Sequence, residues 1–209
     1  AYGSDTPIKP KKSVIFSIAI CLGLLLPFVI AYLCHILNTK EESRRELQEA
    51  LSAPYLGDIP RFEGKANQSF VVKEDGRDAL SEAFRMVAVN LSFMSVDKSI
   101  NVIMTTSSIP HSGKTFISSN LAFTLAASGK RVVLIDLDLR RRTLSKIMGH
   151  RNDRRGITSY LSGNIASLSD IITKSNIHAN LDMIFAGPQP PNPTEMLMSA
   201  KMEEVMAEL

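Results

Sequence analysis

One short segment carries the residue types that bind phosphate when they stand in this order. Residues 108–116 have the sequence Ser-Ile-Pro-His-Ser-Gly-Lys-Thr-Phe, which fits the P-loop pattern G-x-x-x-x-G-K-[ST] except that serine replaces the first glycine. Such a loop presents consecutive backbone N–H groups to a phosphate at the start of a helix. Gly113 would let the backbone approach, Lys114 would supply charge to the outer phosphates, and Thr115 would offer its hydroxyl to Mg²⁺. The predicted nucleotide-binding residues are Ser108, Ile109, Pro110, His111, Ser112, Gly113, Lys114, Thr115 and Phe116.

The segments on either side of this motif have the composition of a strand and a helix. Residues 99–106 are mostly apolar and β-branched, which predicts a buried strand. Residues 116–129 predict a helix that ends at Gly129, since glycine commonly closes a helix. A G-K-T between a strand and a helix is the context in which the motif binds phosphate. An ordinary strand–turn–helix is the alternative.

Two acidic residues follow a second apolar run. Residues 131–139 predict a strand in which Asp136 and Asp138 share one face, because side chains alternate along a strand. Both acids would lie at its C-terminal end, where open α/β sheets bind ligands. Carboxylates there could hold Mg²⁺ together with Thr115, and could accept a proton from an attacking hydroxyl. Asp136, Asp138 and Lys114 are therefore the predicted catalytic residues. The alternative is a polar strand end that leads into a loop.

A basic stretch comes directly after these acids. Such a run is usually a solvated face, and contacts with phosphates, an acidic tail or anionic lipid are the alternatives. Its members are Arg140, Arg141, Arg142, Lys146, Arg151, Arg154 and Arg155. The chain as a whole carries a net charge of only +3, so it lacks the strong cationic excess of a nucleic-acid-binding domain. The two cysteines lie in an apolar segment and the histidines are scattered, which argues against structural zinc.

The remaining periodicities complete an alternation of helices and strands. A final helix is expected from Pro193, with Asn192 as its N-cap and Glu195 completing a capping box. The other expected elements are helices at 79–94, 157–162 and 167–174 and a strand at 180–187. This order predicts an α/β fold of the P-loop NTPase type, with a parallel sheet that has helices on both faces.

The N-terminal part is predicted to cross a membrane once. Residues 14–37 contain no Asp, Glu, Lys or Arg and are long enough to span a bilayer as a helix. A cleavable signal peptide is the alternative, but its apolar core is shorter and ends at a small-residue cleavage site. We expect residues 1–13 to lie outside the cytoplasm and residues 38–78 to form a juxtamembrane helix and a linker. Basic residues flank both sides of the span, so the nucleotide motif alone assigns the following domain to the cytoplasm.

Together these motifs resemble bacterial tyrosine kinases of the capsular and exopolysaccharide type. The resemblance extends over nearly the whole chain, and the segments that carry it are the membrane helix and residues 53–60, 81–94, 105–141, 156–163 and 186–197. It implies a protein-tyrosine autokinase that uses ATP and Mg²⁺ and controls polysaccharide chain length or export. It further implies that the chain lies in the bacterial inner membrane with its P-loop domain in the cytoplasm.

The resemblance also implies partners, and some residues of this sequence depart from the family pattern. The implied partners are further copies of the chain in a ring and the polysaccharide polymerase and export machinery, with no nucleic acid. Glu82 and Arg85 match the start of a Glu-x-x-Arg-x-x-Arg element that the family uses in ring assembly, whereas Ala88 replaces its last arginine. His111 stands where the family usually has glycine.

Two parts of the family pattern are expected beyond this sequence. They are a third acidic motif, the Walker B strand, and a C-terminal tyrosine cluster, so residues 79–209 are expected to be the N-terminal part of the kinase domain. Two other functions stay open. One is a non-catalytic polysaccharide co-polymerase scaffold with a degenerate nucleotide site, and the other is a membrane-tethered partitioning-type ATPase.

Overall fold

The structure is a computed structural model of the 209-residue chain. It describes residues 12–37, 53–64, 68–94, 100–150 and 154–209. The chain divides into two units, Ala1–Tyr55 and Leu56–Leu209, which are described separately.

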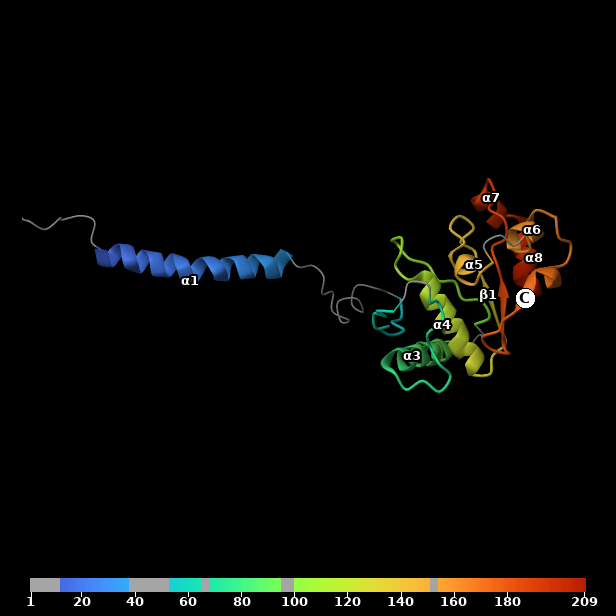
Figure 1. Cartoon of the computed structure of the whole chain (residues 1–209), viewed down its shortest axis with the longest axis horizontal. Helices are drawn as coiled ribbons and strands as arrows, with labels where there is room; N and C mark the ends of the chain where they lie inside the picture. The colour runs from blue at the N-terminus through green and yellow to red at the C-terminus, as the bar shows by residue number, and fades with distance from the viewer. Residues whose placement is uncertain (1–11, 38–52, 65–67, 95–99, 151–153) are drawn as a thin grey trace, which may run out of the picture. The chain divides into compact units, whose positions relative to one another are not determined.

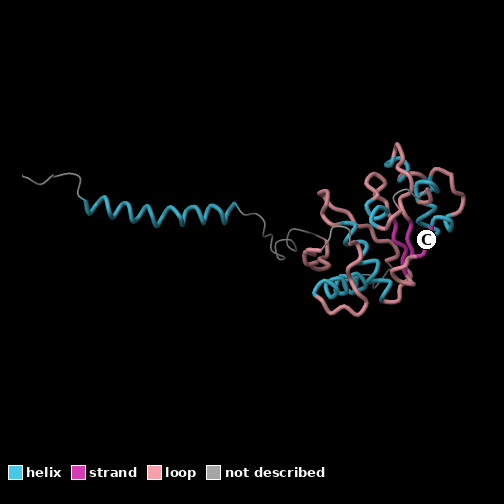
Figure 2. Tube along the Cα trace, in the orientation of Figure 1, coloured by secondary structure: helices cyan, strands magenta, loops and turns pink. Residues whose placement is uncertain are grey.

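The first unit contains one long apolar helix, α1, which extends over Lys12–Leu37 with Pro27 inside it (Figure 2). Its Lys12–Cys34 portion is long and apolar enough to cross a membrane, and its large side chains are exposed. The expected helix is therefore present. Proline is tolerated there because neighbouring groups can satisfy the freed backbone carbonyl in a membrane. Most of the expected N-terminal approach and the expected juxtamembrane helix at 38–52 lie outside the described residues.

The second unit is built on a three-stranded sheet. Strands β1 (Val132–Ile135) and β3 (Leu181–Ile184) pair in parallel, with Val132 opposite Leu181, as the alternation of elements predicts. Strand β2 (Ile172–Lys174) pairs antiparallel to β3, which gives the order β1-β3-β2. The helix predicted at 167–174 is wrong in its second half. Only the 3₁₀ turn η1 (Leu168–Ile171) forms, because the β-branched residues that follow it pair with β3.

Helices cover both faces of this sheet, as predicted (Figure 1). Leu134 and Met183 point to one face, where they pack with residues of α4 (Lys114–Ala127) and α5 (Thr143–Ile147). Ile184 points to the other face. There it packs with α6 (Ile157–Leu161), with η1 and with α8 (Ala200–Glu208). The period of two along the strands separates these two cores.

Helix α3 (Ala79–Met94) begins and ends at the predicted residues and packs on α4. Phe84 is fully buried and contacts the ring of Phe116 edge to face. Asn120 of α4 makes four hydrogen bonds, three of which fix the chain before α3 and one of which stays within α4. Its Oδ1 accepts from Val71 and Val72 N–H, and its Nδ2 donates to the carbonyls of Ser69 and Phe116. The predicted linker is thereby bound to the first helix of the nucleotide motif.

Two other predictions differ from the structure. Residues 100–106 form no strand, and Val102 and Met104 are 58% and 80% exposed. A strand needs a neighbour to pair with, and no described residue pairs with this segment. The final helix is broken into α7 (Pro193–Leu197) and α8, because Ser199 between them is extended.

The expected capping box at the start of α7 is also wrong. Asn192 occupies the N-cap position, but its side chain makes no hydrogen bond with the backbone of the helix. Its Nδ2 instead donates to Glu195 Oε2 at 2.9 Å. The two side chains satisfy each other, so the first turn of α7 keeps its backbone N–H groups without side-chain caps.

Candidate functional site

The P-loop is an exposed turn that ends where α4 begins. Helix α4 starts at Lys114, two residues before the predicted start, so the first-turn N–H groups belong to the motif itself. Gly113 is its N-cap and has a φ of 93° in the left-handed region. A Cβ there would meet nothing within 4 Å, so the backbone angle, and not lack of space, requires glycine. This glycine-capped helix start is the backbone arrangement that the P-loop pattern predicts.

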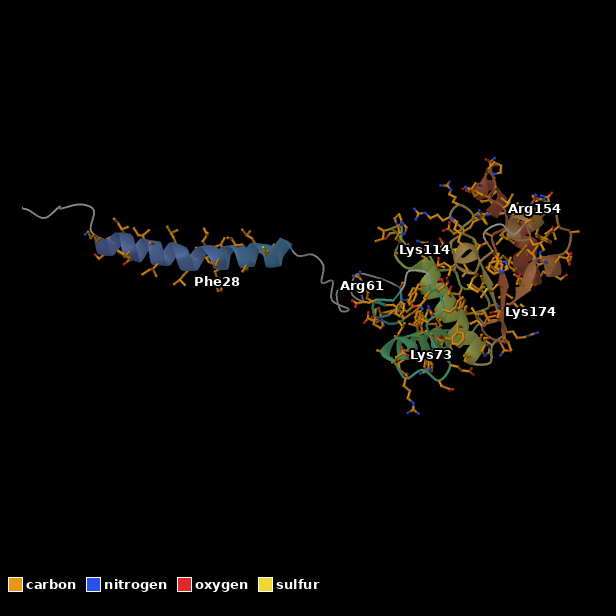
Figure 3. The ribbon with its side chains drawn as sticks, in the orientation of Figure 1. Phe28, Arg61, Lys73, Lys114, Arg154 and Lys174 are labelled. Carbon is orange, nitrogen blue, oxygen red and sulfur yellow. The ribbon has the colours of Figure 1, made fainter. Side chains whose placement is uncertain are left out.

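Side chains of the P-loop differ in what they contact. Lys114 Nζ donates to Ser107 Oγ at 2.8 Å, and that hydroxyl donates to the carbonyl of Ile109 (Figure 3 labels Lys114). Thr115 is half-buried in the first turn of α4. The ring of Phe116 packs inward against Phe62 and Phe84, so only its backbone is available to a phosphate.

Asp136 is the buried acid of the site, 6% exposed. Its Oδ2 accepts hydrogen bonds from Ser145 N–H at 2.9 Å and from Ser145 Oγ at 2.7 Å. Its Oδ1 accepts only a long bond from Asp138 N–H, at 3.3 Å. Burial raises the pKa of Asp136, although the Ser145 donors lower it and nearby Asp138 raises it further. Oδ1 is thus the more weakly hydrogen-bonded of the two carboxylate oxygens.

Ser145 is a site residue that sequence reasoning missed. It lies in α5, and its hydroxyl accepts from Ala186 N–H at 3.1 Å while it donates to Asp136. The accepted bond fixes the orientation of the hydroxyl, so its proton points to the carboxylate. No local motif links Ser145 with Asp136, because Ser145 lies in α5, beyond the turn that follows β1, and only the folded chain brings them together.

Asp138 lies in a different environment from Asp136. Strand β1 ends at Ile135, so both acids belong to the following loop and the predicted placement on one strand face is wrong. Asp138 is exposed, and its Oδ1 accepts from Arg141 N–H at 3.0 Å. The loop still brings the two acids together, since Asp138 N–H donates to Asp136.

A contact between two side chains connects the acidic loop with the P-loop. Arg141 Nη1 lies 2.8 Å from His111 Nε2. His111 itself has a φ of 61°, which is uncommon for a residue other than glycine. Among the described residues, no hydrogen bond or ion pair joins Lys114 or Thr115 to Asp136 or Asp138. The Arg141–His111 contact therefore carries the link between the two predicted halves of the site.

The rest of the basic stretch is mainly exposed to solvent, which agrees with the interpretation of the run as a solvated face. Arg140, Lys146, Arg154 and Arg155 are exposed, and Arg151 lies outside the described residues. Arg142 differs, because its Nη1 donates to the carbonyl of Gly187 at 2.9 Å and so ties the loop after β1 to the loop after β3.

The described residues contain no group of three or more His, Cys, Asp or Glu side chains arranged to hold a metal ion. The oxygen donors present are the carboxylates of Asp136 and Asp138 and the hydroxyl of Thr115. Mg²⁺ commonly binds through one or two carboxylates together with substrate phosphates and water. The donor set thus fits Mg²⁺ in the presence of a nucleotide better than it fits a metal held by protein alone.

The fold and the site together define an α/β nucleotide-binding domain. The chain belongs to the family of CobQ/CobB/MinD/ParA nucleotide binding domains, whose family model matches residues 103–208. Among solved structures, the chain is 31% identical to the kinase domain of Escherichia coli tyrosine kinase ETK. That match has a TM-score of 0.70 and covers 80% of this chain and 68% of that one. The BceF tyrosine kinase domain is also 31% identical, with a TM-score of 0.67 and coverage of 80% and 71%. The chain is therefore a member of the bacterial tyrosine kinase domain family.

Curated relatives place this domain within longer proteins. The chain is 34% identical to tyrosine-protein kinase wzc of Salmonella typhimurium over 96% of this chain and 29% of that protein. It is 30% identical to tyrosine-protein kinase etk of Escherichia coli K12 over 96% of this chain and 30% of that protein. The chain thus spans about three-tenths of the length of the curated relatives it matches.

Proposed function

We propose that this chain is the membrane-proximal and nucleotide-binding part of an ATP-dependent protein-tyrosine autokinase. The kinase would be anchored in the bacterial inner membrane by α1, with its P-loop domain in the cytoplasm, and would act in capsular or exopolysaccharide biosynthesis and chain-length control. The observation that carries the proposal is the contact of Arg141 with His111. It brings a phosphate-binding helix start and a loop with a buried acid together. Similarity to named tyrosine kinases supports the choice of reaction.

In this proposal the residues of the chain divide the work of phosphoryl transfer. The backbone of residues 108–116 binds the phosphates, and Lys114 offsets charge on the γ-phosphate. Asp136 or Asp138 accepts the proton of the tyrosine hydroxyl that attacks the phosphate. Oδ1 of Asp136 suits this task because Oδ2 already receives both Ser145 donors. Most of the rate enhancement would come from positioning and charge neutralisation.

We infer that Thr115, Asp136 and Asp138 would hold Mg²⁺ beside the nucleotide. Bound Mg²⁺ would supply charge neutralisation for the β- and γ-phosphates. The Thr115 hydroxyl lies in the first turn of α4, which is the position that the P-loop pattern requires. The exposed carboxylate of Asp138 is accessible without any rearrangement of the core.

The proposed partners are other copies of the chain in a ring and the polysaccharide polymerase and export machinery. Glu82 and Arg85 of the assembly-type element contact each other on α3. Arg85 Nη2 also donates to the carbonyls of Glu74 and Gly76 within its own chain. Exposed Glu82 is therefore the part of the element that remains accessible to a neighbour.

A second candidate is a co-polymerase scaffold whose nucleotide site only regulates assembly. Two observations favour it. The first P-loop glycine is replaced by Ser108, and His111 holds a strained φ while its ring is occupied by Arg141. Both features would reduce the freedom of the loop to close around a phosphate.

Intact-protein mass spectrometry tests the kinase proposal. The full-length kinase of this proposal is purified from membranes, treated with phosphatase, freed of the phosphatase and incubated with ATP and Mg²⁺, beside a Lys114→Met variant as control. We expect tyrosine phosphate on the wild type and none on the variant, since the lysine offsets charge on the γ-phosphate. A full-length wild-type protein that acquires no tyrosine phosphate contradicts autokinase activity. ATP hydrolysis measured in the same samples would then separate the ATPase from the scaffold.

A further inference from the structure

The guanidinium of Arg141 lies at the P-loop with a neutral partner. Its Nη1 is 2.8 Å from His111 Nε2. Arginine stays protonated in proteins and can only donate, so His111 Nε2 must accept. The histidine ring in this contact is therefore neutral and carries its proton on Nδ1. A charge-assisted hydrogen bond to a neutral ring leaves the positive charge of Arg141 without an anion.

Lys114 is in the same condition. Its ammonium donates to the hydroxyl of Ser107, which is also neutral. Within the described part of the chain, no acidic side chain lies within ion-pair distance of either cation. Two cations thus flank one exposed loop whose backbone has the form of a phosphate-binding turn. A polyanion fits this arrangement better than a neutral ligand does.

The backbone of Arg141 is fixed while its side chain is exposed. Its N–H donates to Asp138 Oδ1 at 3.0 Å, which holds the Cα in the acidic loop. The guanidinium can therefore leave His111 without any movement of the loop. Its planar fork matches two oxygens of a phosphate, which a point charge such as Lys114 cannot do.

We propose that Arg141 binds the terminal phosphate of the nucleotide and that His111 holds its guanidinium when no nucleotide is present. This inference rests on the proposed nucleotide site. It makes Arg141 a specificity residue that distinguishes a nucleoside triphosphate from a diphosphate. It also makes the His111 contact a competitor of the phosphate, since the contact must break before Arg141 reaches its ligand.

Calorimetric titration of the purified, detergent-solubilised protein with ATP and with ADP, both in Mg²⁺, tests the proposal. The variants are Arg141→Ala, Arg141→Lys, His111→Ala, the Arg141→Ala/His111→Ala double variant and Lys114→Met. Arg154→Ala is the matched control, because it removes the same charge from an exposed arginine that lies away from Lys114 (Figure 3). Circular dichroism confirms that each variant is folded.

We expect Arg141→Ala to weaken ATP binding about tenfold and ADP binding much less, with Arg141→Lys in between. His111→Ala should tighten ATP binding about threefold in the wild-type background and not at all in the Arg141→Ala background. Arg154→Ala should bind ATP as the wild type does.

If Lys114→Met abolishes ATP binding, the nucleotide site is supported, and two results would then overturn only the role of Arg141. One is unchanged ATP affinity in Arg141→Ala, and the other is an equal effect of His111→Ala in both backgrounds. ATP binding that survives in Lys114→Met would overturn the proposed nucleotide site, and the role of Arg141 with it.

Discussion

Two aspartates of this chain each receive hydrogen bonds from one serine, but one aspartate is exposed and the other is buried. Asp78, before α3, accepts from Ser81 N–H at 3.0 Å and from Ser81 Oγ at 2.7 Å. Asp136, after β1, accepts from Ser145 N–H at 2.9 Å and from Ser145 Oγ at 2.7 Å. The hydrogen bonds from Ser81 lower the pKa of exposed Asp78, whereas burial raises the pKa of Asp136.

The difference shows that burial, and not the set of donors, decides what each acid does. Asp78 is an N-cap, since its carboxylate accepts from the third residue of α3. The same donors cannot offset the loss of water around Asp136. A fold that keeps an acid buried at such a cost is expected to use it, which supports the proposed role of Asp136.

The largest expected effect separates the two acids by activity. Asp136→Asn should reduce autophosphorylation by about 100-fold or more, because the amide can accept the Ser145 donors but cannot take a proton. Asp78→Asn should stay within about twofold of the wild type, since its carboxylate only caps a helix. The measurement is the initial rate of tyrosine phosphorylation in equal amounts of folded protein. If the Asp136→Asn variant keeps more than half of the wild-type rate, Asp136 is not the base, and Asp138 becomes the candidate.

The second expected effect separates the two serines by stability. Ser145→Ala removes a donor to a buried carboxylate and leaves Ala186 N–H without its acceptor, so we expect a loss of about 2 kcal/mol in the free energy of unfolding. Ser81→Ala should cost less, because water can replace the lost donor at exposed Asp78. Urea unfolding followed by circular dichroism measures both. Equal losses would mean that burial does not distinguish the two pairs.

The local signals in the sequence predicted most of the fold. The periodicity of residues 79–94 predicted both ends of α3, and the G-K-T predicted that a helix follows the loop, although α4 begins two residues before the predicted start. Prediction failed where the pairing of strands determines the secondary structure. Residues 100–106 have the composition of a strand but no described partner, and Ile172 lies in a strand only because β3 lies beside it.

The site was predictable only as far as its motifs are local. Gly113 and the two acids could be found because their spacing is short. The contacts of Ser145 with Asp136 and of Arg141 with His111 join residues that meet only in the folded chain. The alternation along a strand also gave the wrong environment for Asp138, because β1 ends before it. Burial of Asp136 depends on the packing of α5 and β3, which no single motif encodes.

A third prediction concerns how Asp136 makes stability depend on pH. Its pKa in the folded protein is raised above the ordinary value of 3.8, so the folded state binds the proton more tightly than the unfolded state. Stability from this group is greatest at low pH and is lost as the pH rises from 3.8 through the folded pKa. Asp136→Asn lacks this loss, so its free energy of unfolding should rise relative to that of the wild type between pH 4 and pH 7. Urea unfolding across that range measures it, and a gain that shrinks with rising pH would contradict it.

The smallest expected effect is the opposite pH dependence of stability at Asp78. Its pKa in the folded protein is lowered below 3.8, first by the Ser81 hydroxyl and then by the Ser81 N–H. The stability it contributes is therefore present above 3.8 and is lost as the pH falls through the folded pKa. Asp78→Asn should be less stable than the wild type at neutral pH, and the two should converge in acid. The same unfolding series measures this, with opposite slopes expected for the two variants. Parallel slopes would show that Asp136 is solvated like Asp78, and burial would then no longer support its proposed role.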